Sequence, residues 1–329
     1  MLLTFAPWWV LVLGQVPLAR PNTLVLFTAT TAQLLPMLPI SLHPEGWKEL
    51  LSSTYPVHIF SETLQRKARY GAKVSYEGPE HRIRWPILVS ANDPPSVIDM
   101  DLQLYLQQGR VVEIQGLGPK VIILPLGLIL KPSGGYSCIH HLSALLKFYV
   151  NDHISSQNGQ LKYALFNEAL DPVWKAGNGA ILVKRDLEDA FRQIPILLSD
   201  WWLFGFQWQG KMFAERFLSF GLHMAPRIFN YFPVALYWIL ANRSSGAITH
   251  YLVDFLAIFL AVDRERAQEY EVIFARTCQA LSLKIKISKH ASSTIIESLG
   301  LIIDTIKMEA CLPKEKKDRG LVLIMGLVA

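Results

Sequence analysis

The chain is poor in cysteine, because its 329 residues include only three, Cys138, Cys278 and Cys311. They lie far apart, form no C-x-x-C pair and are odd in number. This pattern favours neither a disulfide framework nor a zinc site. Internal repeats and low-complexity tracts are also missing from the sequence. The cysteine usage is typical of a protein in a reducing, intracellular compartment.

A long uninterrupted hydrophobic run is lacking as well. The apolar start, residues 1–19, contains Pro7 and Gly14 and has no Lys or Arg before Arg20, and residues 23–42 are interrupted by polar and proline residues. A bilayer span needs ~20 apolar residues, and a signal peptide begins with a positively charged segment. We therefore expect an intracellular protein, in the cytoplasm or nucleus, without stable membrane association. The apolar start leaves a secreted or membrane-attached protein as an alternative.

The composition, 51% hydrophobic and 18% charged, indicates a packed globule of one large or two modest domains. With 32 Lys and Arg against 27 Asp and Glu, the net charge of +5 permits a polyanionic partner without requiring one. One region of the first hundred residues is locally basic, and we interpret it as a solvated face. Its members are Arg66, Lys67, Arg69, Lys73, Arg82 and Arg84.

Hydrophobic spacing predicts several elements in the first half of the chain. Residues 96–106 have apolar side chains at helical intervals and are followed by Gln108-Gly109, which ends the helix. Residues 121–131 form a strand-like run that enters a tight turn and returns through residues 136–140. Lys131 would lie at the tip of this hairpin.

In the second half, a buried strand over residues 180–185 runs straight into Asp186. We predict a helix over residues 187–194, stopped by Pro195, because proline cannot continue a helix. The pattern further predicts a β-hairpin of residues 203–208 and 211–217 and a helix that begins near Ala225-Pro226.

Two aspartates stand at strand ends. Asp186 leaves the strand over residues 180–185, and Asp254 lies in the hairpin sequence His250-Tyr251-Leu252-Val253-Asp254-Phe255. Phosphoryl transfer with two divalent ions requires carboxylates that converge from separate strands. Either aspartate alone is weak evidence, since a lone Asp at a strand end is more often a turn residue.

Several segments match a known family in order and spacing. Together they resemble the reverse transcriptase of retrotransposons, most closely the tyrosine-recombinase elements of the DIRS type, over roughly residues 42–319. The matching segments are Pro125–Gly135, Ile139–Ser143 and Val150–Ile154 (fingers), Val183–Pro195 (motif A), Leu218–Asn230 (motif B), Tyr251–Phe255 (motif C), Lys289 (motif D), Ser298–Asp304 (motif E) and Leu312–Lys314 (the approach to the thumb).

The resemblance implies roles for individual residues. Asp186 and Asp254, with the Leu187 carbonyl, would hold two Mg²⁺ or Mn²⁺ ions, and Lys289 would protonate the leaving pyrophosphate. The implied nucleotide-binding residues are Lys131 on the outgoing phosphates, the backbone N–H groups of Asp189 and Ala190, Phe191 as a steric gate against a 2′-hydroxyl, and Phe220 and Gly221 beside the templating base. For Phe191 and Lys131, a core aromatic and a solvated lysine are the alternatives.

The sequence also departs from the family pattern. Val253 occupies the position of a metal-binding acid, and valine offers no oxygen. Ser137 and Cys138 stand where basic residues usually follow an aromatic residue, here Tyr136. These departures cluster at the expected site, so the sequence resembles a degenerate, truncated copy of such an element.

The expected fold is α+β, a right-hand polymerase whose ferredoxin-like palm has an antiparallel sheet. Its expected parts are an apolar segment of unknown role (1–40), a helical and partly basic region (41–115), fingers that overlap it (85–180), a palm (181–305) and the start of a truncated thumb (306–329).

The expected function is template-directed DNA synthesis from deoxynucleoside triphosphates on an RNA or DNA template with a primer, impaired by Val253. The alternative is a catalytically inactive nucleic-acid-binding remnant. The sequence leaves the oligomeric state open.

Overall fold

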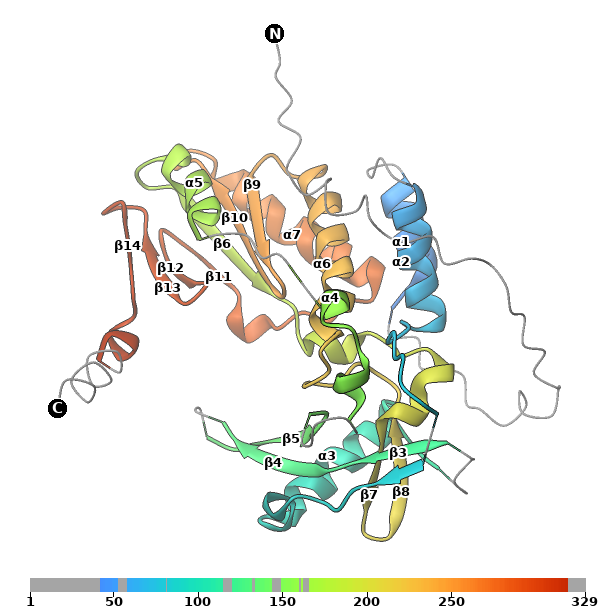
Figure 1. Cartoon of the computed structure of the whole chain (residues 1–329). Helices are drawn as coiled ribbons and strands as arrows, with labels where there is room; N and C mark the ends of the chain where they lie inside the picture. The colour runs from blue at the N-terminus through green and yellow to red at the C-terminus, as the bar shows by residue number, and fades with distance from the viewer. Residues whose placement is uncertain are drawn as a thin grey trace. The chain divides into compact units, whose positions relative to one another are not determined.

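A computed structural model describes most of the chain after residue 41 (Figure 1). The described residues are 42–52, 58–80, 82–114, 120–131, 134–143, 149–159, 161 and 166–318. They all belong to one compact unit, residues 38–329. The expected apolar segment 1–40 and the last residues of the expected thumb lie outside the described residues. The described part contains no helix that is long and apolar enough to cross a membrane.

The architecture is mixed α+β, as expected. The helices are α1 (Pro44–Ser52), α2 (His58–Tyr70), α3 (Pro95–Gln107), α4 (Ser156–Gly159), α5 (Phe166–Ala176), α6 (Ala225–Ala241) and α7 (Arg264–Leu281). The predicted helices at 96–106 and near Ala225-Pro226 are confirmed as α3 and α6.

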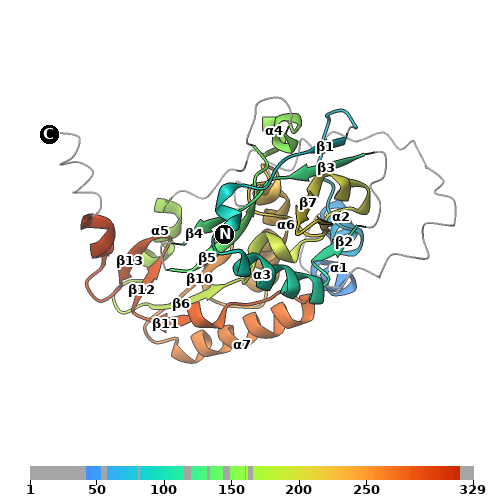
Figure 2. The same cartoon turned by 90° about the horizontal axis from the view of Figure 1, so that it is seen from below.

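A four-stranded antiparallel sheet carries both aspartates. Its order is β11 (Ala291–Ser293), β6 (Ile181–Asp186), β10 (Asp254–Phe259) and β9 (Ala247–Tyr251). Along β10 the side chains alternate, because successive residues of a strand point to opposite faces. Leu256 and Ile258 join a cluster with α5, whereas the Phe255 ring lies 5.6 Å from the Phe274 ring of α7. Figure 1 and Figure 2 show α7 running beside this sheet.

A five-stranded sheet has the order β1 (Arg82–Arg84), β3 (Val121–Leu124), β7 (Gly205–Trp208), β8 (Lys211–Glu215) and β2 (Val111–Glu113). A separate hairpin pairs β4 (Leu126–Leu130) with β5 (Tyr136–His140), and a third sheet joins β12 (Ile295–Ser298), β13 (Leu301–Asp304) and β14 (Glu309–Cys311). The predicted strand 121–131 is thus two strands in two sheets. They separate at Pro125, which has no N–H to continue a ladder.

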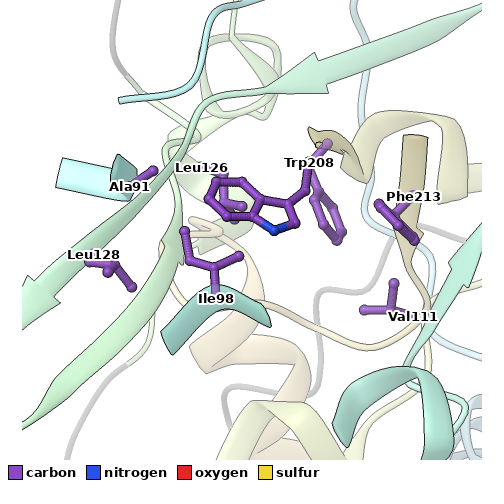
Figure 3. Packing of buried hydrophobic residues seen from close by; sticks show 8 residues of the cluster. Ala91, Ile98, Val111, Leu126, Leu128, Trp208 and Phe213 are labelled. Atoms are coloured by element: carbon purple, nitrogen blue, oxygen red, sulfur yellow. The ribbon is translucent and has the colours of Figure 1, made fainter. Parts of the chain in front are cut away.

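An apolar cluster joins the five-stranded sheet, the β4–β5 hairpin and α3 (Figure 3). Its buried members are Ala91, Ile98, Val111, Leu126, Leu128, Phe206, Trp208 and Phe213. The Trp208 indole N–H donates a hydrogen bond to Asp99 Oδ1 at 2.7 Å, which satisfies the polar end of this large side chain.

Two predicted elements were wrong in detail. The helix expected over residues 187–194 is only a short 3₁₀ turn, Ala190–Gln193, because Asp189 and Ala190 adopt φ angles of +57° and +32°. Left-handed residues interrupt a right-handed helix. The predicted hairpin is confirmed as β7 and β8, but a 3₁₀ helix, Leu198–Phe204, occupies the beginning of its first expected strand.

Candidate functional site

Asp186 ends β6 and Asp254 begins β10, and the antiparallel register pairs these two residues directly. Asp186 is buried, at 2% exposure, while the Asp254 side chain retains 24% exposure. The strands therefore bring the two predicted catalytic carboxylates to the same edge of the four-stranded sheet.

Two lysines accompany this carboxylate pair. Lys289 Nζ donates a hydrogen bond to Asp186 Oδ2 at 3.0 Å, and Lys184 Nζ lies 4.0 Å from Asp254 Oδ1. The hydrogen bond to Asp186 raises the pKa of Lys289, which keeps its amine charged at neutral pH. Lys289 was predicted for this site, whereas Lys184 was not. Period-two alternation along β6 could have indicated it, since Lys184 precedes Asp186 by two residues.

Asp254 is poorly compensated by its surroundings. Burial, followed by the adjacent Asp186 carboxyl, raises its pKa to about 6. Within the described residues, its buried Oδ1 has no hydrogen-bond partner. An oxygen of this kind suits a cation or a proton.

Val253 lies in the two-residue turn between β9 and β10. Its backbone carbonyl accepts a hydrogen bond of 3.0 Å from the Leu187 N–H, which ties the turn to the end of β6. Leu252, beside it, adopts a φ of +50°. This left-handed conformation is energetically unfavourable for any residue that has a β-carbon. The backbone of the turn is thus held in place, although the Val253 side chain has no oxygen.

The chain after Asp186 is held by Gln193, a buried residue that sequence reasoning did not single out. Its side-chain amide donates to the Glu188 carbonyl, and its Oε1 accepts a hydrogen bond of 2.7 Å from the Lys284 N–H. A glutamine in an expected helix gives no signal for such a contact, because its partner Lys284 is 91 residues away.

Asp189 and Ala190 form the left-handed turn described above. Asp189 Oδ2 accepts a charge-assisted hydrogen bond of 2.5 Å from Arg110, whose side chain is only 7% exposed. The pairing fixes the carboxylate of Asp189 against β2, so its backbone and not its side chain remains the candidate nucleotide contact.

Phe191 and Phe220 come together, with ring centroids 5.2 Å apart, and Phe229 of α6 lies 5.6 Å from Phe191. Phe220 is 49% exposed, whereas Phe191 is half-buried. Gly221 has a φ of +95°, and a Cβ there would approach the His140 carbonyl to 3.3 Å. Glycine is therefore required by both backbone conformation and space.

Asn151 positions the turn that contains Gly221. Its Nδ2 donates to the Gly221 carbonyl at 2.8 Å, and its Oδ1 accepts from the His223 N–H at 2.9 Å. The sequence placed Asn151 in a matching segment but assigned it no role.

Lys131 lies at the tip of the β4–β5 hairpin, as predicted, and is exposed. Its N–H donates to the Gly135 carbonyl at 2.9 Å. Within the described residues it forms no ion pair with Asp186 or Asp254. The structure thus keeps Lys131 free at the hairpin tip and does not join it to the carboxylate pair.

Ser137 and Cys138 occupy successive positions of β5, so their side chains point to opposite faces. Cys138 packs against the apolar cluster of Figure 3, and burial raises its pKa to about 12. A cation at position 138 would therefore lie in an apolar environment, and only position 137 offers a site for one.

A second group of charged side chains lies beneath the β4–β5 hairpin, and we call it the buried ionic cluster. It comprises Arg110, His140, Asp189, Arg192 and Glu215. Glu215 Oε1 lies 3.3 Å from Arg192 Nη2 and 3.8 Å from His140 Nε2. Burial lowers the pKa of His140 to about 3 and raises that of Glu215. The imidazole is thus neutral at physiological pH.

The donor set at the carboxylate pair consists of oxygens, which Mg²⁺ and Mn²⁺ prefer. The unpartnered Asp254 oxygen fits one divalent ion. No group of three His, Cys, Asp or Glu side chains able to hold a metal occurs within the described ranges. The residues fit one ion better than two, because two adjacent cations need more than two carboxylates to offset their repulsion.

The fold is that of a reverse transcriptase. One neighbour, a foamy viral protease-reverse transcriptase in complex with dsDNA, aligns with a TM-score of 0.54 at 19% identity, over 87% of this chain and 59% of that one. A foamy viral protease-reverse transcriptase dRH in complex with dsDNA aligns with a TM-score of 0.56 at 18% identity, over 92% of this chain and 50% of that one. A foamy viral protease-reverse transcriptase in complex with an RNA/DNA hybrid aligns with a TM-score of 0.54 at 17% identity, over 91% of this chain and 38% of that one.

The chain thus spans between 38% and 59% of the lengths of these three proteins. No protein-family model and no curated protein matches the sequence. The likeness establishes the reverse transcriptase fold, and the chemistry is argued from the site.

Proposed function

We propose that this chain is a reverse-transcriptase-like domain that binds an RNA or DNA template with a primer and supports weak template-directed DNA synthesis. The observation that carries the proposal is the direct pairing of Asp186 with Asp254 across β6 and β10. The neighbours' complexes with dsDNA and with an RNA/DNA hybrid support a nucleic-acid partner. We further propose descent from a DIRS-type element that has become degenerate, with fingers over residues 85–180, a palm over 181–305 and the start of a thumb at 306–329.

Asp186, Asp254 and the Leu187 carbonyl would hold the divalent ion. When bound there, Mg²⁺ or Mn²⁺ supplies charge neutralisation and lowers the pKa of the attacking 3′-hydroxyl. The Lys289 ammonium, kept charged by its hydrogen bond to Asp186, would give a proton to the leaving pyrophosphate. Val253 leaves the second ion without a carboxylate, which is the reason for a weak reaction.

The remaining candidate residues would position the deoxynucleoside triphosphate. The paired rings of Phe191 and Phe220 would lie beside the sugar and the templating base, where Phe191 excludes a 2′-hydroxyl and Gly221 permits close approach. Lys131 and the backbone of Asp189 and Ala190 would meet the phosphates. Ser137 and Cys138 supply no charge for this contact.

Primer extension on a homopolymer template tests the proposal. The native chain, Val253→Asp and Asp186→Asn are compared with Mg²⁺ and with Mn²⁺. We expect Val253→Asp to extend at least about tenfold faster than the native chain, which corresponds to about 1.4 kcal/mol in the barrier, and Asp186→Asn to be inactive. Val253→Asp should fold normally, because the bond to Leu187 uses the backbone. Equal rates for the native chain and Val253→Asp would show that Val253 does not limit the reaction.

A catalytically inactive nucleic-acid-binding remnant is the second candidate. It is favoured by the two lysines, since Lys289 pairs with Asp186 and Lys184 partly offsets the charge of Asp254 without a metal. This function predicts no extension by any variant together with binding of a primer-template whose affinity falls steeply with salt. Mn²⁺ titration by calorimetry separates the two candidates. A polymerase site would bind Mn²⁺ and lose that binding in Asp186→Asn, whereas the remnant would bind no Mn²⁺ at this site in either protein.

A further inference from the structure

Helices α2 and α6 contact each other through aromatic and basic side chains. The Phe60 ring of α2 stacks on the Tyr231 ring of α6, with centroids 5.8 Å apart. Phe60, Leu64 and Lys67 follow helical spacing and share one face of α2. This face carries Lys67 Nζ to 5.2 Å from the centre of the Tyr231 ring. Lys67, expected to lie on a solvated surface, is instead half-buried.

Two arginines lie near this amine. Arg227 precedes Tyr231 by four residues, so the two side chains are neighbours on α6. Its Nη1 donates a hydrogen bond of 2.8 Å to the Gln157 carbonyl, which holds one end of the guanidinium in place. The pKa of Lys67 is lowered to about 8, mainly by burial and in smaller part by the charges of Arg66 and Arg227. Three cations therefore repel one another in a small region.

No carboxylate balances these cations. Every Asp and Glu of the chain lies within the described residues. Among those residues, none forms an ion pair with Arg66, Lys67 or Arg227, and the nearby Glu45 pairs with Arg69 instead. Lys67 and Arg227 are half-buried, whereas Arg66 is exposed. The two half-buried cations are costly without a counter-ion, because burial strengthens their repulsion. An anion from outside the chain would remove that cost.

We propose that Arg66, Lys67 and Arg227 form a binding site for a phosphate group, with the Tyr231 ring as its apolar wall. Arg227 presents planar donors and Lys67 a compact charge, a combination suited to phosphate oxygens. The phosphate is either a free ion or a backbone phosphate of a nucleic acid, and the recognition chemistry is the same. The site is formed by α2 and α6 and does not depend on whether the chain synthesises DNA.

The first arm of the test uses inorganic phosphate alone. Thermal unfolding at pH 7 is measured in sodium phosphate and in sodium chloride of equal ionic strength. Phosphate should raise the Tm of the native chain, because a ligand that binds only the folded state stabilises it. Lys67→Gln and Arg227→Gln should abolish the rise. Arg66→Gln, an exposed change that leaves the packing intact, should reduce it.

The second arm uses a labelled duplex oligonucleotide and measures its affinity against salt concentration. The Lys67→Gln/Arg227→Gln double variant should lower the slope of log K against log salt by about 1.8, since each phosphate contact contributes about 0.9. Each single variant should lower the slope by about 0.9. Lys48→Gln, which removes one charge at an exposed position of neighbouring α1, is the matched control for Lys67→Gln.

A Tm rise that Lys67→Gln and Arg227→Gln abolish supports the site with a free ion as its ligand, because the general stabilising effect of phosphate salts would persist in the variants. A slope change without such a rise supports it with backbone phosphate. The proposal is overturned if the variants behave as the native chain does in both arms. It is equally overturned if Lys48→Gln has the same effect as Lys67→Gln, because the effect would then be one of net charge.

Discussion

The carboxylate pair on the four-stranded sheet and the buried ionic cluster beneath the β4–β5 hairpin both gather opposite charges, yet they differ in access. Beside the buried Asp186, the side chains of Asp254 and Lys289 are 24% and 50% exposed. In the second group the side chains of Arg192 and Glu215 are 8% and 2% exposed, and only Asp189, at its rim, reaches 37%. In the proposed function, the first group would exchange its lysines for a metal ion or a substrate. The second can only exchange one internal contact for another, so its role is to hold the scaffold.

This comparison predicts its largest effect at Glu215. We expect Glu215→Gln to destabilise the fold by about 3–5 kcal/mol, because it leaves Arg192 as an uncompensated buried charge. Urea unfolding measures the loss. The matched control is Glu113→Gln, which removes an exposed pair with Lys211 and should cost less than about 1 kcal/mol. Similar losses at the two positions would mean that burial does not distinguish these pairs.

A cation added to β5 sharpens the comparison. Cys138→Arg should cost about 3 kcal/mol, because the new charge is buried against the apolar cluster beside Arg192, and the nearby carboxylates of Asp101 and Glu215 offset only part of that cost. Ser137→Arg, one residue away on the opposite face, should change stability by less than about 0.5 kcal/mol. Thermal unfolding of both variants provides the measurement, and a Cys138→Arg protein as stable as the native chain would contradict the packing described here.

Acid sensitivity should come from the buried cluster. The folded pKa of His140 is lowered to about 3 from 6.5, so the unfolded chain binds the extra proton between these values. Stability from this group is complete above pH 6.5 and decreases as the pH falls towards 3, by up to about 1.4 kcal/mol per pH unit. His140→Gln should flatten this dependence in urea unfolding between pH 5 and 7.

Other groups face His140. Glu215, whose pKa burial raises, acts in the opposite direction, and Arg192 stays charged throughout. The comparison is therefore made between variants, with His58→Gln, an exposed position at the start of α2, as the control. An unchanged pH dependence in His140→Gln would show that His140 is not the source of the acid sensitivity.

The smallest effect is expected at the carboxylate pair. Lys289→Gln should reduce stability by less than about 1 kcal/mol, since half of its side chain is exposed and water screens the ion pair with Asp186. Urea unfolding without divalent ions is the measurement. A loss above about 2 kcal/mol would place Lys289 in the scaffold and weaken its assignment to the exchangeable group.

Much of the fold could be predicted from local patterns. The strand ending at Asp186, the hairpin carrying Asp254 and the helix α6 all follow from side-chain periodicity and from proline and glycine positions. The helix expected after Asp186 could not be corrected locally. Its failure depends on the left-handed Asp189, which Arg110 holds from 79 residues away.

The sequence alone determined which residues have chemical groups suited to phosphoryl transfer, Asp186 and Asp254, and that Val253 lacks one, since these follow from residue type and strand spacing. Tertiary structure decided what surrounds them: the lysines beside the carboxylates, the burial of Glu215 and the partial burial of Lys67. These properties depend on contacts between distant segments, which set solvation and charge pairing and leave no periodic signal in the chain.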